Sequence, residues 1–149
     1  MNELLKNPEV LRQLIMEHYQ RPLNHGLVED DSYHTKHQAS ASCIDDLYLQ
    51  MRIEAGVITD LHFDGTACTI STASTSIIGE LIKGKTISEA KTIISEYYKM
   101  INQEDFDAEL LQEAYAFHTV GKQANRIKCA KIGIEGFAEL LEEANDEGK

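Results

Sequence analysis

Residues 63–76 read FDGTACTISTASTS, and this stretch decides how the chain folds. An apolar, strand-like segment ends at Gly65, Cys68 stands at the break, and small hydroxylated residues then begin a helix. The free N–H groups and the macrodipole of a helix N-terminus stabilise an anion there. We therefore expect Cys68 to be exposed where a strand gives way to a helix, and to be favoured as a thiolate.

Alternating polarity on the N-terminal side of this stretch predicts a small antiparallel sheet. In residues 47–54 the odd positions are apolar and the even ones mostly polar, which is typical of a half-buried strand. Ala55 and Gly56 predict a tight turn, and residues 57–63 form the next strand. Residues 33–41 are polar enough to indicate an edge strand, so the predicted sheet has three strands.

Helical patterns precede and follow the predicted strands in the sequence. Asn7 as N-cap and Pro8 as first residue predict a helix that ends before Pro22. Downstream of Cys68 the apolar residues recur with helical spacing to the end of the chain. We expect one helix closed by Gly84, one opened by a capping box of Thr86 and Glu89, a short one around Leu110, and a final one that Asn125 caps and that ends near Ala144.

Strands followed by helices predict an α+β fold, in which helices pack on one face of a three-stranded antiparallel sheet. The 149 residues are enough to bury a core without disulfides or metals. No internal repeat or low-complexity tract divides the sequence, so we expect residues 1–149 to form a single domain.

The charge balance excludes some classes of partner. A net charge of −11 argues against a general binder of nucleic acid or of anionic membranes, since both require a basic surface. The N-terminus lacks the apolar core of a signal peptide, and no segment reaches the roughly 18 apolar residues of a membrane span. We therefore expect a cytoplasmic protein with reduced thiols.

Three cysteines, Cys43, Cys68 and Cys129, each lie at a predicted break between elements. Asp45 follows Cys43 by two residues, so both side chains can project to the same side of an extended segment. Three thiolates and one carboxylate form a tetrahedral set suited to zinc. The sequence has no C-x-x-C pair, however, and spacing alone favours three structural thiols over a metal site.

Other candidate groups carry weaker patterns. The six histidines show no helical pair such as H-E-x-x-H, which indicates surface or packing roles, although His34 and His37 are close enough to Cys43 in sequence to be alternative ligands. Ser71, Ser74 and Ser76 have no accompanying His/Asp arrangement. We therefore expect these serines to cap and pack their helix.

The residues around the cysteines resemble known motifs. Residues 65–74 are similar to the central cysteine motif of the IscU/SufU family of iron–sulfur cluster assembly proteins, which are NifU N-terminal-like. Residues 126–130 resemble the third-cysteine motif of the SufU-type branch, and residues 14–26 resemble the family's first helix and loop. Lys128 stands where the IscU branch has histidine, and residues 101–111 match the position of the SufU-type insertion.

The first cysteine motif departs from the family pattern. The family usually reads Asn-Pro-x-Cys-Gly-Asp, whereas residues 40–45 of this chain read SASCID. Cys43 and Asp45 are retained, but Ile44 replaces the glycine. Glycine permits a positive φ and a close turn around a metal, and a β-branched residue largely forbids that conformation.

The resemblance implies a SufE/NifU-like fold and a role in sulfur handling. It implies a Zn²⁺ site made of Cys43, Asp45, Cys68 and Cys129, at which Cys43 accepts sulfur from a pyridoxal-phosphate (PLP)-dependent cysteine desulfurase. Arg126 would assist by a charge-assisted hydrogen bond to Asp45. If active in this way, the protein is a zinc-dependent sulfurtransferase that passes sulfur to a downstream iron–sulfur scaffold or apo-protein.

Two alternatives remain open at this point. The same four residues could hold iron or a transient [2Fe–2S] cluster, so that the protein is a scaffold with Asp45 as a weak ligand. Alternatively, the change at Ile44 marks a divergent relative whose zinc is only structural. Bound metal and the effect on a desulfurase distinguish these functions.

Overall fold

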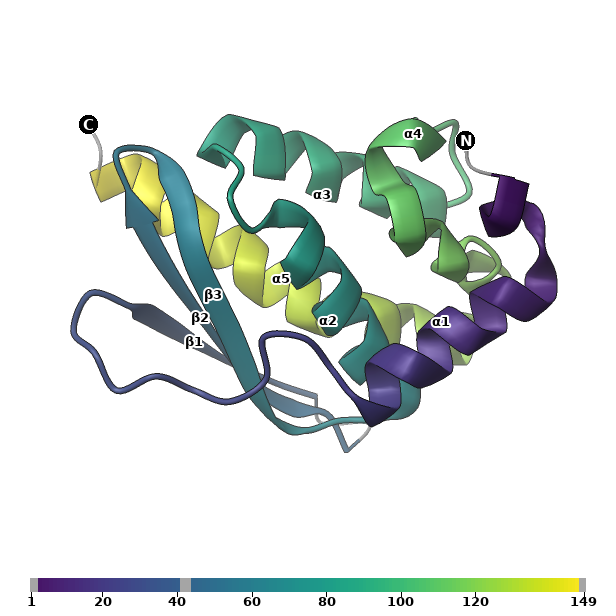
Figure 1. Ribbon diagram of the computed structural model, residues 1–149, viewed down its shortest axis with the longest axis horizontal. Helices are drawn as coiled ribbons and strands as arrows, with labels where there is room; N and C mark the ends of the chain where they lie inside the picture. The colour runs from purple at the N-terminus through teal and green to yellow at the C-terminus, as the bar shows by residue number, and fades with distance from the viewer. Residues whose placement is uncertain (1–2, 41–43, 148–149) are drawn as a thin grey trace.

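The protein consists of a three-stranded antiparallel sheet with helices packed on one face (Figure 1). The computed structural model describes residues 3–40 and 44–147, with the side chains of residues 145–147 outside that description. The predicted α+β class is confirmed. The strands are β1 (His34–Ala39), β2 (Asp46–Glu54) and β3 (Val57–Thr66); the helices are α1 (Pro8–Gln20), α2 (Thr69–Ile82), α3 (Ile87–Ile101), α4 (Ala108–Leu111) and α5 (Ala124–Glu147); the 3₁₀ turns are η1 (Glu3–Lys6), η2 (Gln112–Phe117) and η3 (Val120–Lys122).

The sheet has the order β1-β2-β3, so β1 is an edge strand as its polarity predicts. β2 and β3 are joined by Ala55 and Gly56, which both have positive φ, at 53° and 77°. A two-residue turn of this kind matches the right-handed twist of the strands and sets their register, which pairs Leu49 with Phe63. The predicted hairpin is confirmed.

One face of the sheet is covered by α5, which packs against β1 and β2 and also against α2 (Figure 1). α1 packs in turn on α2, so α2 lies at the centre of the helical layer. Burial of these apolar faces supplies the main driving force for folding. The core includes Leu47, Leu49, Met51, Leu61 and Phe63 from the sheet, and Ile78, Ile94, Tyr97, Ile134 and Phe137 from the helices.

The predicted helix starts agree with the structure except at α5. The Asn7 side chain accepts a hydrogen bond from the Glu9 N–H, and Thr86 and Glu89 form the expected capping box. The prediction that Asn125 caps the final helix is wrong, because α5 begins at Ala124 and Asn125 lies in its first turn. The Arg126 N–H already bonds to the carbonyl of Gln123, 2.8 Å away. Helical geometry thus begins earlier than the side chains indicate.

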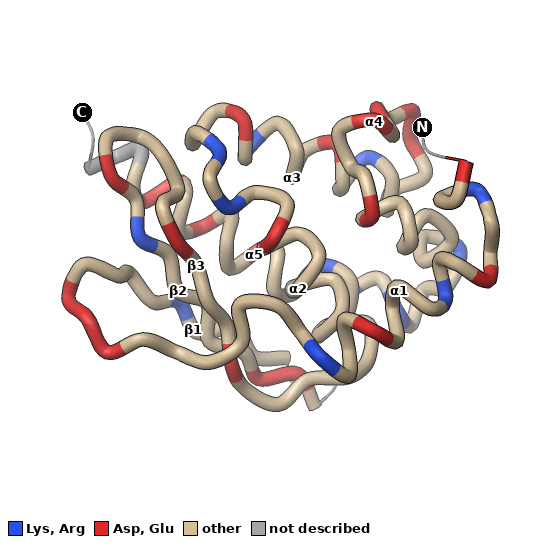
Figure 2. The backbone as a smooth tube through the Cα atoms, viewed as in Figure 1, with Lys and Arg blue, Asp and Glu red and all other residues tan. Residues whose placement is uncertain are grey.

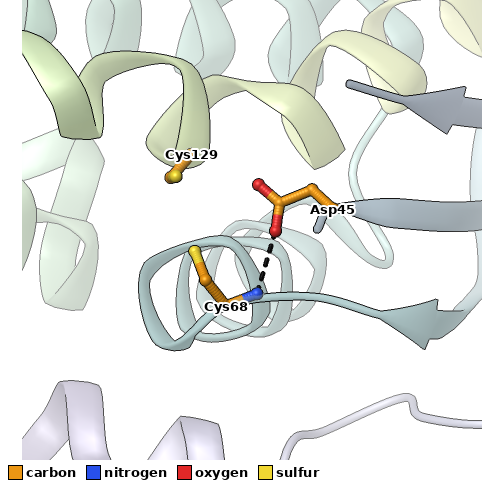
Figure 3. A group of neighbouring side chains, drawn as sticks. All are labelled: Asp45, Cys68 and Cys129. Carbon is orange, nitrogen blue, oxygen red and sulfur yellow. Dashed lines mark hydrogen bonds between the residues drawn. The ribbon is translucent and has the colours of Figure 1, made fainter. Parts of the chain in front are cut away.

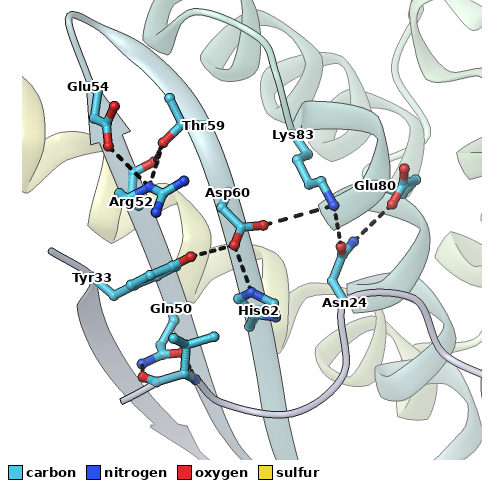
Figure 4. A network of polar contacts seen from close by, with 11 residues as sticks. Asn24, Tyr33, Gln50, Arg52, Glu54, Thr59, Asp60, His62, Glu80 and Lys83 are labelled. Carbon is cyan, nitrogen blue, oxygen red and sulfur yellow. Dashed lines mark hydrogen bonds and ion pairs between the residues drawn. The ribbon is translucent and has the colours of Figure 1, made fainter. Parts of the chain in front are cut away.

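A polar network fastens residues 21–33 over the other face of the sheet (Figure 4). The backbone of this loop pairs with the edge of β3, since Gly26 N lies 2.8 Å from Phe63 O. At its end the Tyr33 hydroxyl donates to Asp60, whose carboxylate also lies 2.8 Å from His62 Nε2. Burial opposes ionisation of Asp60, but these hydrogen bonds outweigh it and lower the pKa of the carboxyl group.

Charged residues are unevenly distributed over this fold. Glu29, Asp30 and Asp31 follow one another in the loop before β1, whereas basic residues are scattered over several elements (Figure 2).

Within residues 3–40 and 44–147, none of the helices combines the length and the apolar composition that crossing a membrane requires.

Candidate metal centre

Asp45, Cys68 and Cys129 converge where β2 begins, α2 begins and α5 passes both (Figure 3). One carboxylate oxygen and the two sulfur atoms all lie within 4.8 Å of one another. These three are the predicted ligands that the structure describes. Cys43, the fourth, lies outside the described residues.

Asp45 directly precedes β2 and is only 1% exposed. Its Oδ1 accepts the backbone N–H of Cys68 at 2.9 Å, so a carboxylate from the sheet satisfies one of the free donors at the start of α2. Its carbonyl accepts the N–H of Ser40 at 3.0 Å. That bond closes the base of the connection between β1 and β2, in which residues 41–43 lie.

Cys68 is the N-cap residue of α2, as the strand-to-helix break predicts. Its sulfur accepts the N–H of Ser71 at 3.4 Å, and its side chain is half-buried rather than exposed. Gly65 lets Cys68 lie close to Asp45. It has φ +124°, and a Cβ at residue 65 would lie 2.1 Å from the carbonyl oxygen of Asp46. Glycine thus allows the end of β3 to pass against the start of β2.

Cys129 lies in the second turn of α5, because this helix begins before the predicted Asn125 cap. Its half-buried side chain faces the start of α2 (Figure 3). Gly133, one turn further along α5, lies directly against α2. The close approach of two helices therefore determines how near Cys129 comes to Cys68.

The electrostatic environment of Cys129 is unfavourable for a bare thiolate. Burial raises the pKa of the Cys129 thiol to about 12, and the neighbouring Cys68 and Asp45 add to this effect, partly opposed by a hydrogen bond with Ser71. Asp45, Cys68 and Cys129, which can each carry a negative charge, thus lie close together. A cation placed among them would remove their mutual repulsion.

The donor set fits zinc. Two thiolates and a carboxylate are ligands that Zn²⁺ takes in tetrahedral sites, and the sulfurs are soft enough to select it over magnesium or calcium. Sulfur ligands also suit iron–sulfur clusters. Asp45, Cys68 and Cys129 would hold such a group, and their separations require only a small contraction around an ion.

A groove of about 530 Å³ adjoins the two cysteines. Its walls combine apolar residues, among them Ile15 and Met16 of α1, with the basic residues Arg12 and Arg126. Arg126 is exposed and lies three residues before Cys129. Its predicted hydrogen bond to Asp45 stays a prediction.

The remaining sequence candidates have other surroundings. His37 pairs with Asp46 and stacks on Tyr48, with ring centroids 4.4 Å apart. Within the described residues, the group able to hold a metal includes neither His34 nor His37. His18 is buried, and its Nδ1 lies 2.7 Å from Ser76 Oγ, which fits the predicted packing role.

Ser71 is the residue that sequence reasoning missed. The prediction assigned it to capping and packing, but its hydroxyl also donates to Asp45 Oδ2 at 2.5 Å and lies 3.2 Å from Cys68 Sγ. The spacing Cys68-x-x-Ser71 contains a usable signal, because the third residue of a helix can reach back to its N-cap. The sequence cannot show that a carboxylate from β2 meets it there.

Similar proteins connect this geometry with a family. The family profile described as NifU-like N terminal domain matches residues 10–130. The zinc-dependent sulfurtransferase SufU of Bacillus subtilis is 33% identical over 138 residues, which cover 92% of this chain and 91% of that protein. The iron–sulfur cluster assembly scaffold protein IscU of Thermotoga maritima is 31% identical over 112 residues, which cover 75% and 79%.

A solved structure agrees in three dimensions. It belongs to a candidate iron–sulfur cluster assembly scaffold protein for the SUF system (FiSufU) from Fervidobacterium islandicum AW-1. The two folds superpose with a TM-score of 0.79 and 28% sequence identity, over 87% of this chain and 92% of that chain. The resemblance seen in the cysteine motifs therefore extends to the whole architecture.

Proposed function

This chain belongs to the NifU-like N-terminal domain family of iron–sulfur cluster assembly proteins, and from that premise we propose that it accepts sulfur from a cysteine desulfurase at a zinc-bound cysteine site. The proposed ligands are Cys43, Asp45, Cys68 and Cys129. The observation that carries the proposal is the convergence of the three described ligands within 4.8 Å.

The proposed reaction is a thiol–persulfide exchange. The Cys43 thiolate attacks the outer sulfur of a persulfide on the desulfurase cysteine. A new S–S bond forms on Cys43, the S–S bond of the donor breaks, and its electron pair leaves with the desulfurase cysteine as a thiolate. No external oxidant or reductant is required.

Chain connectivity supports Cys43 as the acceptor. It precedes Asp45 by two residues, and two residues span at most about 7 Å. The bond between Ser40 N and Asp45 O holds the two ends of its segment together. Cys68 instead caps α2 and Cys129 belongs to α5, and the packing of these two helices restricts the movement of both cysteines.

The other residues have supporting roles in this proposal. A bound zinc ion would keep the thiols deprotonated without redox side reactions. Asp45 is the harder and more easily displaced ligand, and Arg126, which lines the groove, would pair with its carboxylate when it is released. The exposed cation Arg126, which lines the groove, also suits the approach of an anionic persulfide.

The partners follow from this chemistry. The sulfur donor is a PLP-dependent cysteine desulfurase, and the sulfur passes on to an iron–sulfur scaffold or an apo-protein. We place the protein in the cytoplasm, where free thiols such as Cys68 and Cys129 stay reduced.

A second function uses the same residues. The relative from Thermotoga maritima is named a scaffold protein, and two thiolates with a carboxylate can also hold a [2Fe–2S] cluster, with the cluster as cargo. The scaffold is therefore the alternative proposal.

Metal analysis of the purified protein separates the two functions. Sulfur transfer predicts a colourless protein with one equivalent of zinc that increases the turnover of a cognate desulfurase. It also predicts a persulfide on the protein after a single turnover, and Cys43→Ser should abolish that persulfide.

Other outcomes of the metal analysis support other functions. A brown protein that absorbs in the visible region supports the scaffold function. Tight zinc with no effect on the desulfurase, and no persulfide on the protein, would overturn both proposals and leave a structural zinc.

A further inference from the structure

The hydroxyl of Ser71 lies against two ligands of the candidate metal centre. Ser71 is fully buried, and its Oγ lies 2.5 Å from Asp45 Oδ2 and 3.2 Å from Cys68 Sγ. One hydroxyl therefore contacts two of the three described ligands, Asp45 before β2 and Cys68 at the start of α2, and Cys129 lies within 4.8 Å of both.

The hydrogen-bonding capacity of a hydroxyl suits this position. A serine side chain has one hydrogen to donate and two lone pairs to accept. Its hydrogen points to the Asp45 carboxylate, which cannot donate, and its lone pairs remain available to the cysteine S–H groups. An alanine here would leave the buried Oδ2 of Asp45 without this donor.

The backbone around Ser71 holds the hydroxyl in place. Its N–H bonds to Cys68 Sγ at 3.4 Å, and its carbonyl accepts the hydroxyls of Ser74 and Thr75 at 3.2 and 2.7 Å. The first turn of α2 is thus fixed from both sides.

We infer that Ser71 is a positioning residue for the metal centre, which it serves by fixing the Asp45 carboxylate at the place where Cys68 and Cys129 meet. The inference rests on the proposed zinc site. A carboxylate oxygen has two lone pairs, so Oδ2 can accept the Ser71 hydrogen and still ligate an ion. The hydroxyl therefore orients the carboxylate without occupying its metal-binding capacity.

A purely structural role for Ser71 predicts a different result. If Ser71 only stabilises the start of α2, its loss lowers the stability of the fold and leaves the affinity for metal unchanged. Ser74 provides the matched control, because it is also buried in α2 and its hydroxyl also bonds within the helix, to the carbonyl of Ser71.

The test compares Ser71→Ala, Ser74→Ala and Ser71→Thr in the full chain. Zinc affinity is measured by competition with a chromophoric chelator, and the visible absorption of the Co²⁺-substituted protein reports the ligand geometry. Loss of a residue that orients a ligand typically weakens metal binding by about 10- to 100-fold. We expect that loss and an altered Co²⁺ spectrum for Ser71→Ala, and wild-type behaviour for Ser74→Ala.

Ser71→Thr keeps the hydroxyl and should retain the affinity and the Co²⁺ spectrum of the wild type. If Ser71→Ala does not fold, the Ser71→Thr variant provides the test of the inference. Weak zinc binding by a folded threonine variant would overturn it. Equal affinities and spectra for Ser71→Ala and Ser74→Ala would overturn it as well.

The outcomes also separate this inference from the proposed function. A wild-type protein that binds zinc but accepts no sulfur overturns the sulfur-transfer function, while the metal measurements on Ser71→Ala still decide the inference. A wild-type protein that binds neither zinc nor Co²⁺ overturns both.

Discussion

Gly133 of α5 packs against Thr75 of α2 so closely that a Cβ at residue 133 would lie 1.9 Å from the Thr75 hydroxyl oxygen. Cys129 lies one turn before Gly133, and Ser71 lies one turn before Thr75. The tightest contact between the two helices thus lies beside the candidate metal centre. Close packing at one glycine determines how near two elements of the site can come.

Gly133→Ala is expected to push α5 away from α2. Overpacking of this kind destabilises a protein by about 1–3 kcal/mol. Because the displacement also moves Cys129 away from Cys68, zinc affinity should fall together with stability. Urea denaturation and chelator competition measure the two effects.

The double variant Gly133→Ala/Thr75→Ala is the control for this prediction. It removes the Thr75 hydroxyl and methyl groups that the new Cβ would meet, and it should recover part of both losses. Strictly additive effects of the two substitutions would show that the contact does not set the helix separation.

Gly65→Ala should disrupt the end of the β2–β3 hairpin. The residue has φ +124°, and an added Cβ would lie 2.1 Å from the backbone carbonyl oxygen of Asp46. Gly84→Ala is the matched control, since Gly84 also has positive φ, at +84°, but open space around it. We expect a loss of about 1–2 kcal/mol for Gly84→Ala, from backbone strain alone, and a clearly larger loss for Gly65→Ala.

The location of Gly65 adds a functional expectation. Displacement of Asp46 shifts its neighbour Asp45, so Gly65→Ala should also weaken zinc binding, whereas Gly84→Ala should leave it unchanged. Equal stability of the two variants in urea would show that the hairpin tolerates the added methyl group.

Asp45→Ala should weaken zinc binding by at least the 10- to 100-fold that loss of a residue orienting a ligand typically causes. The neighbouring Asp46→Ala is the control, because Asp46 is exposed and pairs with His37 at the surface. Isothermal titration with zinc measures both. Unchanged affinity and unchanged sulfur acceptance in Asp45→Ala would remove Asp45 from the site.

Asp60→Asn should destabilise the protein in a pH-dependent way. Hydrogen bonds from Tyr33 and His62 lower the pKa of Asp60 in the folded state, so the stabilisation is present above the unfolded value of about 3.9 and is lost as the pH falls through the lower folded value. We expect a loss of about 1–2 kcal/mol at pH 7. At pH 3 the difference from the wild type should shrink.

Asp64→Asn is the control for the pH effect. Asp64 lies on the same strand, but it is paired with His25 at an exposed site, where ion pairs contribute little. Urea titrations at pH 7 and pH 3 compare the variants. A pH-independent loss in Asp60→Asn would show that packing, not the carboxylate charge, is responsible.

Much of the fold could be predicted from local patterns. Asn7, Thr86 and Glu89 mark helix starts through their side chains, and Ala55–Gly56 marks the hairpin, because these signals act over a few residues. The predicted start of α5, after an Asn125 N-cap, is two residues late, because the first turn is closed by a backbone hydrogen bond that no side-chain pattern indicates.

The candidate site was only partly predictable. The motifs around Cys68 and Cys129 indicated the residue types, and the structure brings these cysteines together with Asp45. Ser71 was assigned to capping alone, because its second partner comes from a different element. Cys43 lies outside the described residues, so its role stays a prediction.

The sequence by itself determined most of the elements and their order, because periodicity, caps and turn residues act locally, and its motifs indicated the candidate ligands. The tertiary structure alone decided which residues meet. Gly65 and Gly133 let backbones approach closely enough for Asp45 and Cys129 to reach the start of α2, and packing at that distance depends on residues far apart in the chain.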